Sequence, residues 1–444
     1  MFILLHIEVE DLSNFFSKLD IKLKRGKNAI LLVWKFWHSL IILKCRLTAC
    51  SYLFFHDCTY LISYKYMKNH KITEVLRQKV KQLLRHEELT EINLLRWLKS
   101  YNFDVDLCAG VIEEYVKNRN CLGLNDDKFY EDFYNQPEIK HYYNVFKQSR
   151  LEYDWINALD NGLVFVEMCP KSASTTAQLI RTGQFLFAFF AWSEYMLRMI
   201  LQRERETSQR SYAVCIFDMD DAGIWQFANP NGPINRLFES RVKLATAYYE
   251  ELLSKVVIMN PPRMLGLLFS IISWLLPRRI IGRFHFVNNA EEASKYISID
   301  AIPIELGGKK VFDVSGSSNG SIIPGKLPNM NVLQNGGIWE KYNINNVQYE
   351  NVFVHSKQSF TRELCVEKNK RLLLYEFHAS RAFRIKLTNE KGDYLLPYLY
   401  MNTTVLSEEG EVKIKLEDGR INLEIRNESI LFAMKLRIAY KFIE

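Results

Sequence analysis

The sequence of 444 residues lacks the short motifs by which many enzymes and metal proteins are recognised. It has no Cys-x-x-Cys pair, no Cys/His cluster with zinc spacing, no GxGxxG or P-loop, and neither Gly-x-Ser-x-Gly nor HExxH. Its eight cysteines are scattered singly, which is typical of reduced cytosolic thiols. These absences exclude a disulfide-rich mini-scaffold, and we predict a protein that is not an enzyme and needs no metal or cofactor.

A concentrated excess of positive charge is also missing. Lys and Arg number 58 against 51 Asp and Glu, and the balance is 31 to 31 over residues 71–337 and 17 to 15 over 338–444. We therefore expect no nucleic-acid surface. With 48% apolar and 25% charged residues, the chain has the composition of a globular protein, and its length suggests two or three domains.

No apolar run reaches the length of a standard membrane span. The longest near the N-terminus, Ala29 to Leu43, has about fifteen residues and is broken by Lys35 and His38, whereas a span needs about twenty. The first residues, MFILLHIEVED, lack a basic segment, so a signal peptide is not expected. Residues 1–70 therefore form a poorly defined extension: an interfacial anchor, a marginal span, or, as we favour, sequence outside any domain.

Residues 71–120 have apolar residues at helical spacing and predict three short amphipathic helices. Thr90 and Asp104 stand where they would cap the second and third of these helices. Periodicity alone indicates nothing beyond a small helical core.

The next region, residues 121–312, alternates predicted strands and helices. Strands are expected over Leu163–Glu167, Tyr212–Met219, Lys255–Asn260 and Arg283–Asn288. Helices are expected over Gln178–Arg203 and Arg236–Leu253. This order predicts an α/β fold with a mainly parallel sheet and crossover helices.

Between the last two strands lies an apolar segment from Arg263 to Leu276, preceded by Pro261-Pro262 and ended by Pro277. At about fourteen residues it is too short to span a bilayer. A helix that is apolar on all sides is buried in a core, faces lipid or covers an apolar cavity. Both a core helix and a mobile lid over a lipid pocket stay open from these residues alone.

Four segments carry a resemblance to a known family: FDMDDAG (217–223), YYEELLSKVVIMNPP (248–262), the apolar segment, and KYISIDAIPIELGG (295–308). Together with LLRWLKSYNFDVDLCAGVIEEYVKNR (94–119), they resemble the CRAL-TRIO domain of phosphatidylinositol/phosphatidylcholine transfer proteins and its helical lead-in. The resemblance implies an apolar pocket floored by the sheet and closed by the apolar segment as a gate helix. The implied gate residues are Leu265, Leu268, Phe269, Ile272, Trp274 and Leu276.

The same resemblance implies where a lipid would be held, but the headgroup residues are mostly replaced. The two headgroup arginines of the family fall on Tyr101 and Leu252, its lysine falls on Arg283, and its glutamate is kept as Glu251. Tyr and Leu cannot make the bidentate phosphate contacts of Arg, so we expect weak phosphoinositide selection. The implied lipid-binding residues are Tyr101, Ala213, Cys215, Phe217, Glu251 and Arg283.

Residues 313–337 are rich in Gly, Ser, Asn and Pro and predict a linker. Residues 338–444 contain seven segments of strand length, with Asp418-Gly419 as a hairpin turn between two of them, and predict a β-sandwich. In position and length this all-β region resembles a GOLD domain, which implies a protein-binding module on secretory-pathway membranes.

We therefore expect a cytoplasmic, peripherally membrane-associated protein, at the Golgi or another secretory-pathway membrane, that binds a phospholipid or other hydrophobic ligand and exchanges it at membranes. The alternative is a trafficking adaptor that recruits a protein partner through its GOLD-like domain, with the lipid as a regulatory passenger. A third hypothesis, an enzyme using the acidic cluster Asp218, Asp220 and Asp221, is less favoured, because acids at a strand end commonly cap the next helix.

Overall fold

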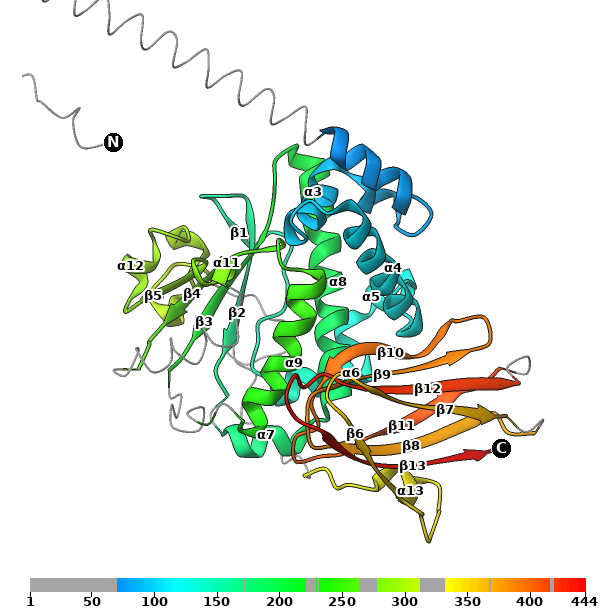
Figure 1. Cartoon of the computed structure of the whole chain (residues 1–444). Coiled ribbons are helices and arrows are strands. Elements are labelled where there is room, and N and C mark those ends of the chain that lie inside the picture. The colour runs from blue at the N-terminus through cyan, green and yellow to red at the C-terminus, as the bar shows by residue number, and fades with distance from the viewer. Residues whose placement is uncertain are drawn as a thin grey trace, which may run out of the picture. The chain divides into compact units, whose positions relative to one another are not determined.

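The computed structural model describes residues 70–170, 172–220, 229, 231–262, 278–311, 332–366, 369–415 and 419–444. These residues form a group of N-terminal helices, a five-stranded sheet with helices on both faces, and a two-sheet β-sandwich (Figure 1). The predicted fold class is confirmed. The residues of the N-terminal extension up to 69 and the gate segment 263–276 lie outside the described residues.

The N-terminal helices begin with helical residues 70–80 and η1 (His86–Leu89), followed by α3 (Glu91–Ser100) and α4 (Val105–Cys121). The predicted caps are confirmed: the Thr90 hydroxyl accepts a hydrogen bond from Asn93 N–H, and the Asp104 carboxylate accepts one from Leu107 N–H. Each cap satisfies a backbone donor that the helix itself leaves free. Shorter helical elements then lead into the sheet: α5 (Asp127–Glu131), η2 (Phe133–Asn135) and α6 (Pro137–Val145).

The sheet has the strand order β1-β2-β3-β4-β5, in which β2 to β5 are parallel and β1 is antiparallel to β2. Its crossover helices α8 and α9 pack against each other between the sheet and the sandwich (Figure 1). We call this sheet with its helices the α/β lobe. Its elements are β1 (Ile156–Asn157), β2 (Gly162–Met168), α7 (Ala173–Leu179), α8 (Thr182–Thr207), β3 (Ala213–Asp218), α9 (Pro233–Tyr248), β4 (Leu253–Met259), α11 (Arg278–Ile281), β5 (Phe284–Val287), α12 (Ala290–Ala293), η4 (Ile299–Ala301) and η5 (Ile304–Leu306).

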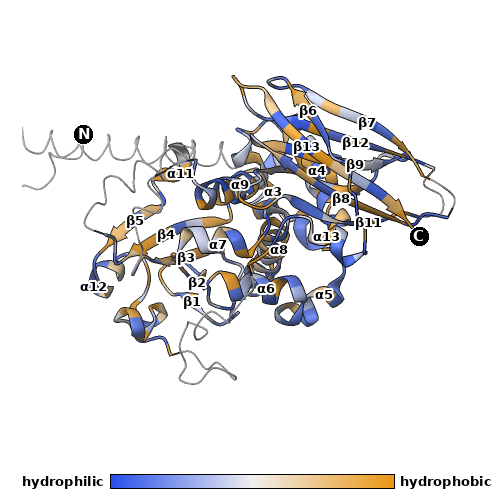
Figure 2. Ribbon diagram, turned by 90° about the horizontal axis from the view of Figure 1, so that it is seen from below, coloured by the Kyte–Doolittle hydropathy of each residue, from blue (hydrophilic) through white to orange (hydrophobic). Residues whose placement is uncertain are grey.

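Both faces of this sheet are covered, so its strands are apolar at successive positions, as Figure 2 shows for β4 and β5. Because side chains alternate across a strand, the odd-numbered residues of β2 and β3 face α8 and α9. The opposite face packs against α12 and the η4–η5 segment through Val164, Val166, Val214, Ile216, Val257 and Met259.

Two predicted helices have different boundaries in the structure. The segment predicted as one helix from Gln178 to Arg203 is divided into α7 and α8, because Arg181 is extended and its guanidinium donates to the carbonyl oxygens of Ser407 and Gln334. The helix predicted to reach Leu253 ends at Tyr248, and Leu253 begins β4.

The C-terminal region is a sandwich of two antiparallel four-stranded sheets, ordered β10-β9-β12-β7 and β11-β8-β13-β6. A short helix, α13 (Gly337–Lys341), precedes it. The strands are β6 (Glu350–Val354), β7 (Ser359–Cys365), β8 (Leu372–Ala379), β9 (Phe383–Asn389), β10 (Tyr394–Met401), β11 (Glu408–Lys413), β12 (Arg420–Asn427) and β13 (Met434–Ile443).

Two predictions about the sandwich are wrong. Strand β10 was not among the predicted strands; the structure places its Pro397 on an edge strand with an irregular register between Leu396 and Leu399. The turn Asp418-Gly419 does not join a hairpin either. Strand β11 pairs with β8, whereas β12 pairs with β7 and β9, so this connection crosses from one sheet to the other.

The edge strand β10 and the residue after it are bound by helices α4 and α8. The Asn118 side chain of α4 accepts a hydrogen bond from Tyr398 N–H at 2.7 Å and donates one to the Tyr398 carbonyl at 3.3 Å, so it pairs with the strand as another strand would. The Thr182 hydroxyl donates to the Asn402 carbonyl at 2.6 Å. These contacts join the lobe and the sandwich within one unit, residues 72–444.

One buried carboxyl group lies at this junction. Glu408, at the start of β11, accepts a hydrogen bond through Oε2 from Gly183 N–H of α8 at 2.9 Å. Its Oε1 has no hydrogen-bond partner among the described residues. Burial raises the pKa of Glu408 to about 7, although Gly183 N–H and the Arg181 guanidinium act in the opposite direction. The carboxyl group therefore takes up a proton near neutral pH.

We expect Glu408→Gln to stabilise the protein at pH 8 and to change little near pH 5. An unfolded glutamate titrates near pH 4.3, so the folded state holds a proton that the unfolded state has released between about pH 4.3 and 7. The free energy of unfolding therefore falls as the pH rises from about 4.3 to 7, and above pH 7 the full destabilisation by the buried carboxylate is present. At pH 8 the neutral amide should raise the free energy of unfolding by on the order of 2 kcal/mol, measured by urea denaturation. The exposed Glu340→Gln is the control, and an equal effect at both pH values would contradict the prediction.

Candidate functional site

An apolar cavity of about 280 Å³ lies between the sheet and the helices α8 and α9. Its floor is formed by residues of β2, β3 and β4 that share one face of the sheet, and its walls are largely aromatic. The volume is near the lower end of the range for small-molecule pockets in proteins. Floor and wall residues include Phe165, Ala213, Cys215, Phe217, Val256 and Ile258, and Phe189, Trp192, Met196, Phe238, Ala245 and Tyr249.

Four of the residues predicted to bind lipid line this cavity: Ala213, Cys215, Phe217 and Arg283. The first three are alternate residues of β3 and point to the same side of the sheet. Burial raises the pKa of the Cys215 thiol well above its usual value, so the thiol stays protonated and unreactive at neutral pH. The cavity floor thus consists of neutral surface at these positions. Their contact with a lipid stays a prediction.

The other two predicted residues lie behind the cavity wall. The Tyr101 hydroxyl donates to the carbonyl oxygen of Ala247 at 2.6 Å, at the end of α9. Glu251 accepts a hydrogen bond from Arg283 Nη2 at 2.5 Å. Leu252, where the resemblance places the second family arginine, does line the cavity, but as an apolar side chain.

Arg283 is already bound by the protein. Besides Glu251, its Nη1 donates to the carbonyl oxygens of Leu253, at 2.7 Å, and of Glu250. These partners fix the guanidinium at the start of β4, where it supports the strand. A lipid phosphate at this point would have to compete with three acceptors.

A second ion pair in the cavity lining was not predicted. Arg241 of α9 and Glu167 of β2 both line the cavity and are joined by two parallel hydrogen bonds, one of them 2.6 Å from Nη2 to Oε2. Burial alone would lower the pKa of Arg241, but the adjacent Glu167 carboxylate raises it, so the guanidinium stays charged. The sequence did hold a signal for Glu167, because residues two apart on a strand face the same side, and Leu163 and Phe165 of β2 face the cavity side of the sheet. No sequence pattern pointed to Arg241 as its partner.

Glu167 and Glu251 do not form a carboxylate pair, because each acid binds a different arginine. In the acidic cluster, Asp218 accepts hydrogen bonds from Asp220 N–H at 3.0 Å and from the Asn260 amide at 2.8 Å, while Asp221 lies outside the described residues. Within the described ranges no group of three or more His, Cys, Asp or Glu residues could hold a metal ion.

The cavity wall is backed by a buried polar cluster centred on Glu194 of α8. Glu194 is fully buried, and its Oε1 accepts hydrogen bonds from the hydroxyl groups of Tyr249, at 2.7 Å, and Tyr115, at 2.5 Å. Tyr249 contributes its ring to the cavity wall, and burial raises the pKa of its hydroxyl group well above the usual value. The cluster therefore holds a cavity residue in place from behind.

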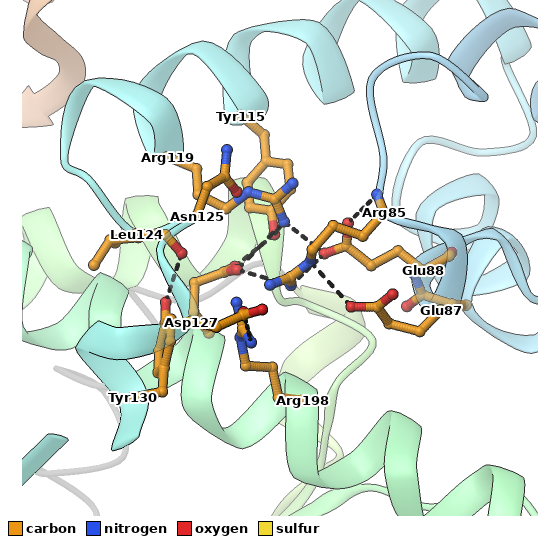
Figure 3. A network of polar contacts seen from close by, with 12 residues as sticks. Arg85, Glu87, Glu88, Tyr115, Arg119, Leu124, Asn125, Asp127, Tyr130 and Arg198 are labelled. Atoms are coloured by element: carbon orange, nitrogen blue, oxygen red, sulfur yellow. Dashed lines mark hydrogen bonds and ion pairs between the residues drawn. The ribbon is translucent and has the colours of Figure 1, made fainter. Parts of the chain in front are cut away.

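Two arginines, Arg119 and Arg85, face the buried carboxylates of this cluster, and Arg85 also lies 3.4 Å from the more exposed Glu87. Figure 3 shows Arg119 of α4 directed toward Glu88 and Arg85 of the preceding segment. Arg119 Nη1 lies 2.5 Å from Glu88 Oε1 and 3.4 Å from Glu194 Oε2, and Arg85 contacts both acids as well. Two arginines thus neutralise two carboxylates, and the N-terminal helices are connected to α8 through the cluster.

Among the described residues, no helix is long and apolar enough to cross a membrane. All the predicted gate residues, Leu265, Leu268, Phe269, Ile272, Trp274 and Leu276, lie outside the described ranges, so their role stays a prediction.

Comparison with known proteins supports the resemblance found in the sequence. The CRAL/TRIO domain profile matches residues 165–308, which contain the cavity floor and both crossover helices. Two CRAL-TRIO domain-containing proteins of Caenorhabditis elegans are similar to this chain: one is 26% identical over 372 residues, covering 82% of this chain and 92% of the relative, and the other is 22% identical over 391 residues, covering 77% and 92%. The crystal structure of Sfh5 matches with a TM-score of 0.40 and 14% identity, covering 52% of this chain and 82% of Sfh5.

The profile match coincides with the cavity-forming part of the lobe. The all-β architecture predicted for the C-terminal region is confirmed. Its resemblance to a GOLD domain stays a prediction. Residues 165–308 are thus similar to the CRAL/TRIO domain, the domain for which both Caenorhabditis elegans relatives are named.

Proposed function

We propose that this protein is a lipid-transfer protein that holds the acyl part of a phospholipid, or of a similar hydrophobic ligand, in the cavity between the sheet and the helices α8 and α9. The observation that carries the proposal is the composition of the cavity: aromatic and aliphatic side chains form its floor and walls, and its two arginines are each paired with a carboxylate. Each methylene group buried there contributes about 0.8 kcal/mol to binding. Apolar contact alone would therefore hold an acyl chain.

The ion pairs bear on which ligand is selected. Arg241 is bound to Glu167, and Arg283 is bound to Glu251 and two carbonyl oxygens, so neither arginine offers its full set of donors to a phosphate. We infer that the hydrocarbon part of the ligand is recognised more strongly than its headgroup. Exchange would take place in the cytoplasm at a membrane surface, where the apolar segment 263–276 would uncover the cavity.

The proposal is tested on the purified full-length protein. We expect an organic extract of the protein, analysed by mass spectrometry, to contain about one lipid molecule per chain, with mixed headgroups and a narrower distribution of chain lengths. An extract without lipid beyond that of a control protein purified in the same way, together with failure to take up a fluorescent acyl lipid from vesicles, would reject it.

A further inference from the structure

Three large apolar side chains are exposed together at one end of the sandwich. Ile430, Leu431 and Phe432, in the loop between β12 and β13, are exposed to 76%, 78% and 56%. Phe353 of β6 is exposed to 66% and pairs with Lys435 of β13, the strand that follows this loop. We call the three loop residues the apolar tip. Folding leaves them in water, so the fold itself gains little from their being apolar.

Side-chain hydrogen bonds from Asn427 and Ser356 fix the backbone of the loop that carries the apolar tip. The fully buried Asn427 donates through its amide to the carbonyl oxygens of Val354, at 3.0 Å, and Phe432, at 2.9 Å, and accepts from Ser429 N–H at 2.9 Å. The Ser356 hydroxyl lies 2.6 Å from the Ile430 carbonyl. These bonds satisfy the loop backbone, and the apolar side chains are thereby presented outward in a defined shape.

Cations surround the apolar tip. In the neighbouring turns and strand, residues 355–358, 380–382 and 428–437, there are four basic residues and one acid, Glu428. The Arg381 guanidinium lies 4.8 Å from the centre of the Phe432 ring, and the Lys435 ammonium lies 5.9 Å from that of Phe353. We call the four cations, Lys357, Arg381, Lys435 and Arg437, the basic rim; Lys357 also lies 3.5 Å from the Glu428 carboxylate, and Arg437 lies over the Tyr349 ring.

We propose that this end of the sandwich docks on the surface of an anionic lipid bilayer, with the apolar tip inserted between headgroups and the basic rim in contact with phosphates. A protruding loop with aliphatic and aromatic residues suits the headgroup–acyl boundary, and juxtamembrane cations are attracted by anionic lipids. A second copy of this chain is a poorer occupant, because two basic rims would repel each other. The inference rests on the proposed function, since a protein that exchanges lipid has to meet a membrane.

The test is co-sedimentation of the full-length protein with vesicles of phosphatidylcholine, with and without phosphatidylserine. We expect binding to depend on phosphatidylserine and to weaken with salt. Leu431→Asp should reduce the partition coefficient about tenfold or more, and Arg381→Glu should remove most of the preference for phosphatidylserine. The matched control is Leu159→Asp, which places the same charge on a residue of the lobe that is 57% exposed, and it should bind as the unmodified protein does.

Two outcomes would overturn the docking proposal: equal vesicle binding of Leu431→Asp and Leu159→Asp, or loss of a dimer rather than of vesicle binding in Leu431→Asp. Normal vesicle binding by Leu431→Met would support the docking proposal. The loss of binding in Leu431→Asp would then be due to the introduced charge and not to the loss of leucine itself. The lipid content of purified Leu431→Asp is measured in parallel. An unchanged lipid content with lost vesicle binding supports docking, whereas a lipid-free unmodified protein would reject the cavity proposal and leave the docking test valid.

Discussion

Arg119→Met is expected to lower the free energy of unfolding by about 3–5 kcal/mol, the cost of removing one member of a buried ion pair. Arg119 is 1% exposed and lies against Glu88 and Glu194, which are equally buried. Burial alone would lower the pKa of Arg119, but the Tyr115 hydroxyl group and both carboxylates raise it, so the guanidinium is charged throughout the working pH range. Methionine fills similar space without the charge and leaves one carboxylate without its counter-ion. Urea denaturation measures the change.

Two further variants separate charge imbalance from lost packing. In Arg119→Met with Glu88→Gln, one positive and one negative charge are removed together, and we expect at least about 1 kcal/mol of the loss to be recovered. Arg420→Met removes an arginine whose ion pair with Glu363 is exposed, with 63% and 53% of the two side chains accessible, and should cost less than about 1 kcal/mol. A loss below 1 kcal/mol for Arg119→Met would mean that the cluster does not hold the N-terminal helices to α8.

The parts of the fold that depend on local pattern could be predicted from the sequence. The four parallel strands are apolar runs between turn residues, and the structure confirms them within one or two residues. The caps at Thr90 and Asp104 are also local, because a cap bonds only to its own first turn.

The features that failed depend on contacts between distant segments. Whether Asp418-Gly419 joins a hairpin is decided by the partners of β11 and β12, and these lie in two sheets. Pro397 is tolerated because β10 is an edge strand. The local sequence does not indicate whether a strand lies at the edge or in the middle of its sheet. The break before α8 arises because Arg181 binds carbonyl groups more than 150 residues away in the chain.

The candidate site shows the same division. Alternation along β3 was enough to place Ala213, Cys215 and Phe217 on one face once the strand was identified. The pairing of Glu167 with Arg241 joins β2 to α9, and that of Glu251 with Arg283 joins the turn between α9 and β4 to the residue before β5, so both needed the tertiary structure. This changes the expected chemistry as well as the geometry. Arg283, which the resemblance places among the headgroup ligands, already donates its hydrogen bonds to groups of the protein.

Ala245→Trp is expected to remove bound lipid while the protein remains folded. Ala245 lies on the cavity side of α9, one turn from both Arg241 and Tyr249, so an indole there would occupy the space between the helix and the sheet. Excluding even two methylene groups of a ligand costs about 1.6 kcal/mol, which is more than a tenfold loss of affinity.

The readouts of this variant are the lipid-to-protein ratio of the organic extract and the rate of acyl-lipid uptake from vesicles, with circular dichroism to show that the fold is kept. Lys243→Trp places the same side chain on the exposed side of the same helix and should retain its lipid. If Ala245→Trp carried as much lipid as Lys243→Trp, the ligand would lie outside this cavity. A loss confined to Ala245→Trp would identify the space bounded by α8, α9 and β3 as the place where the acyl chain is held, because the two variants differ only in the direction in which the indole points.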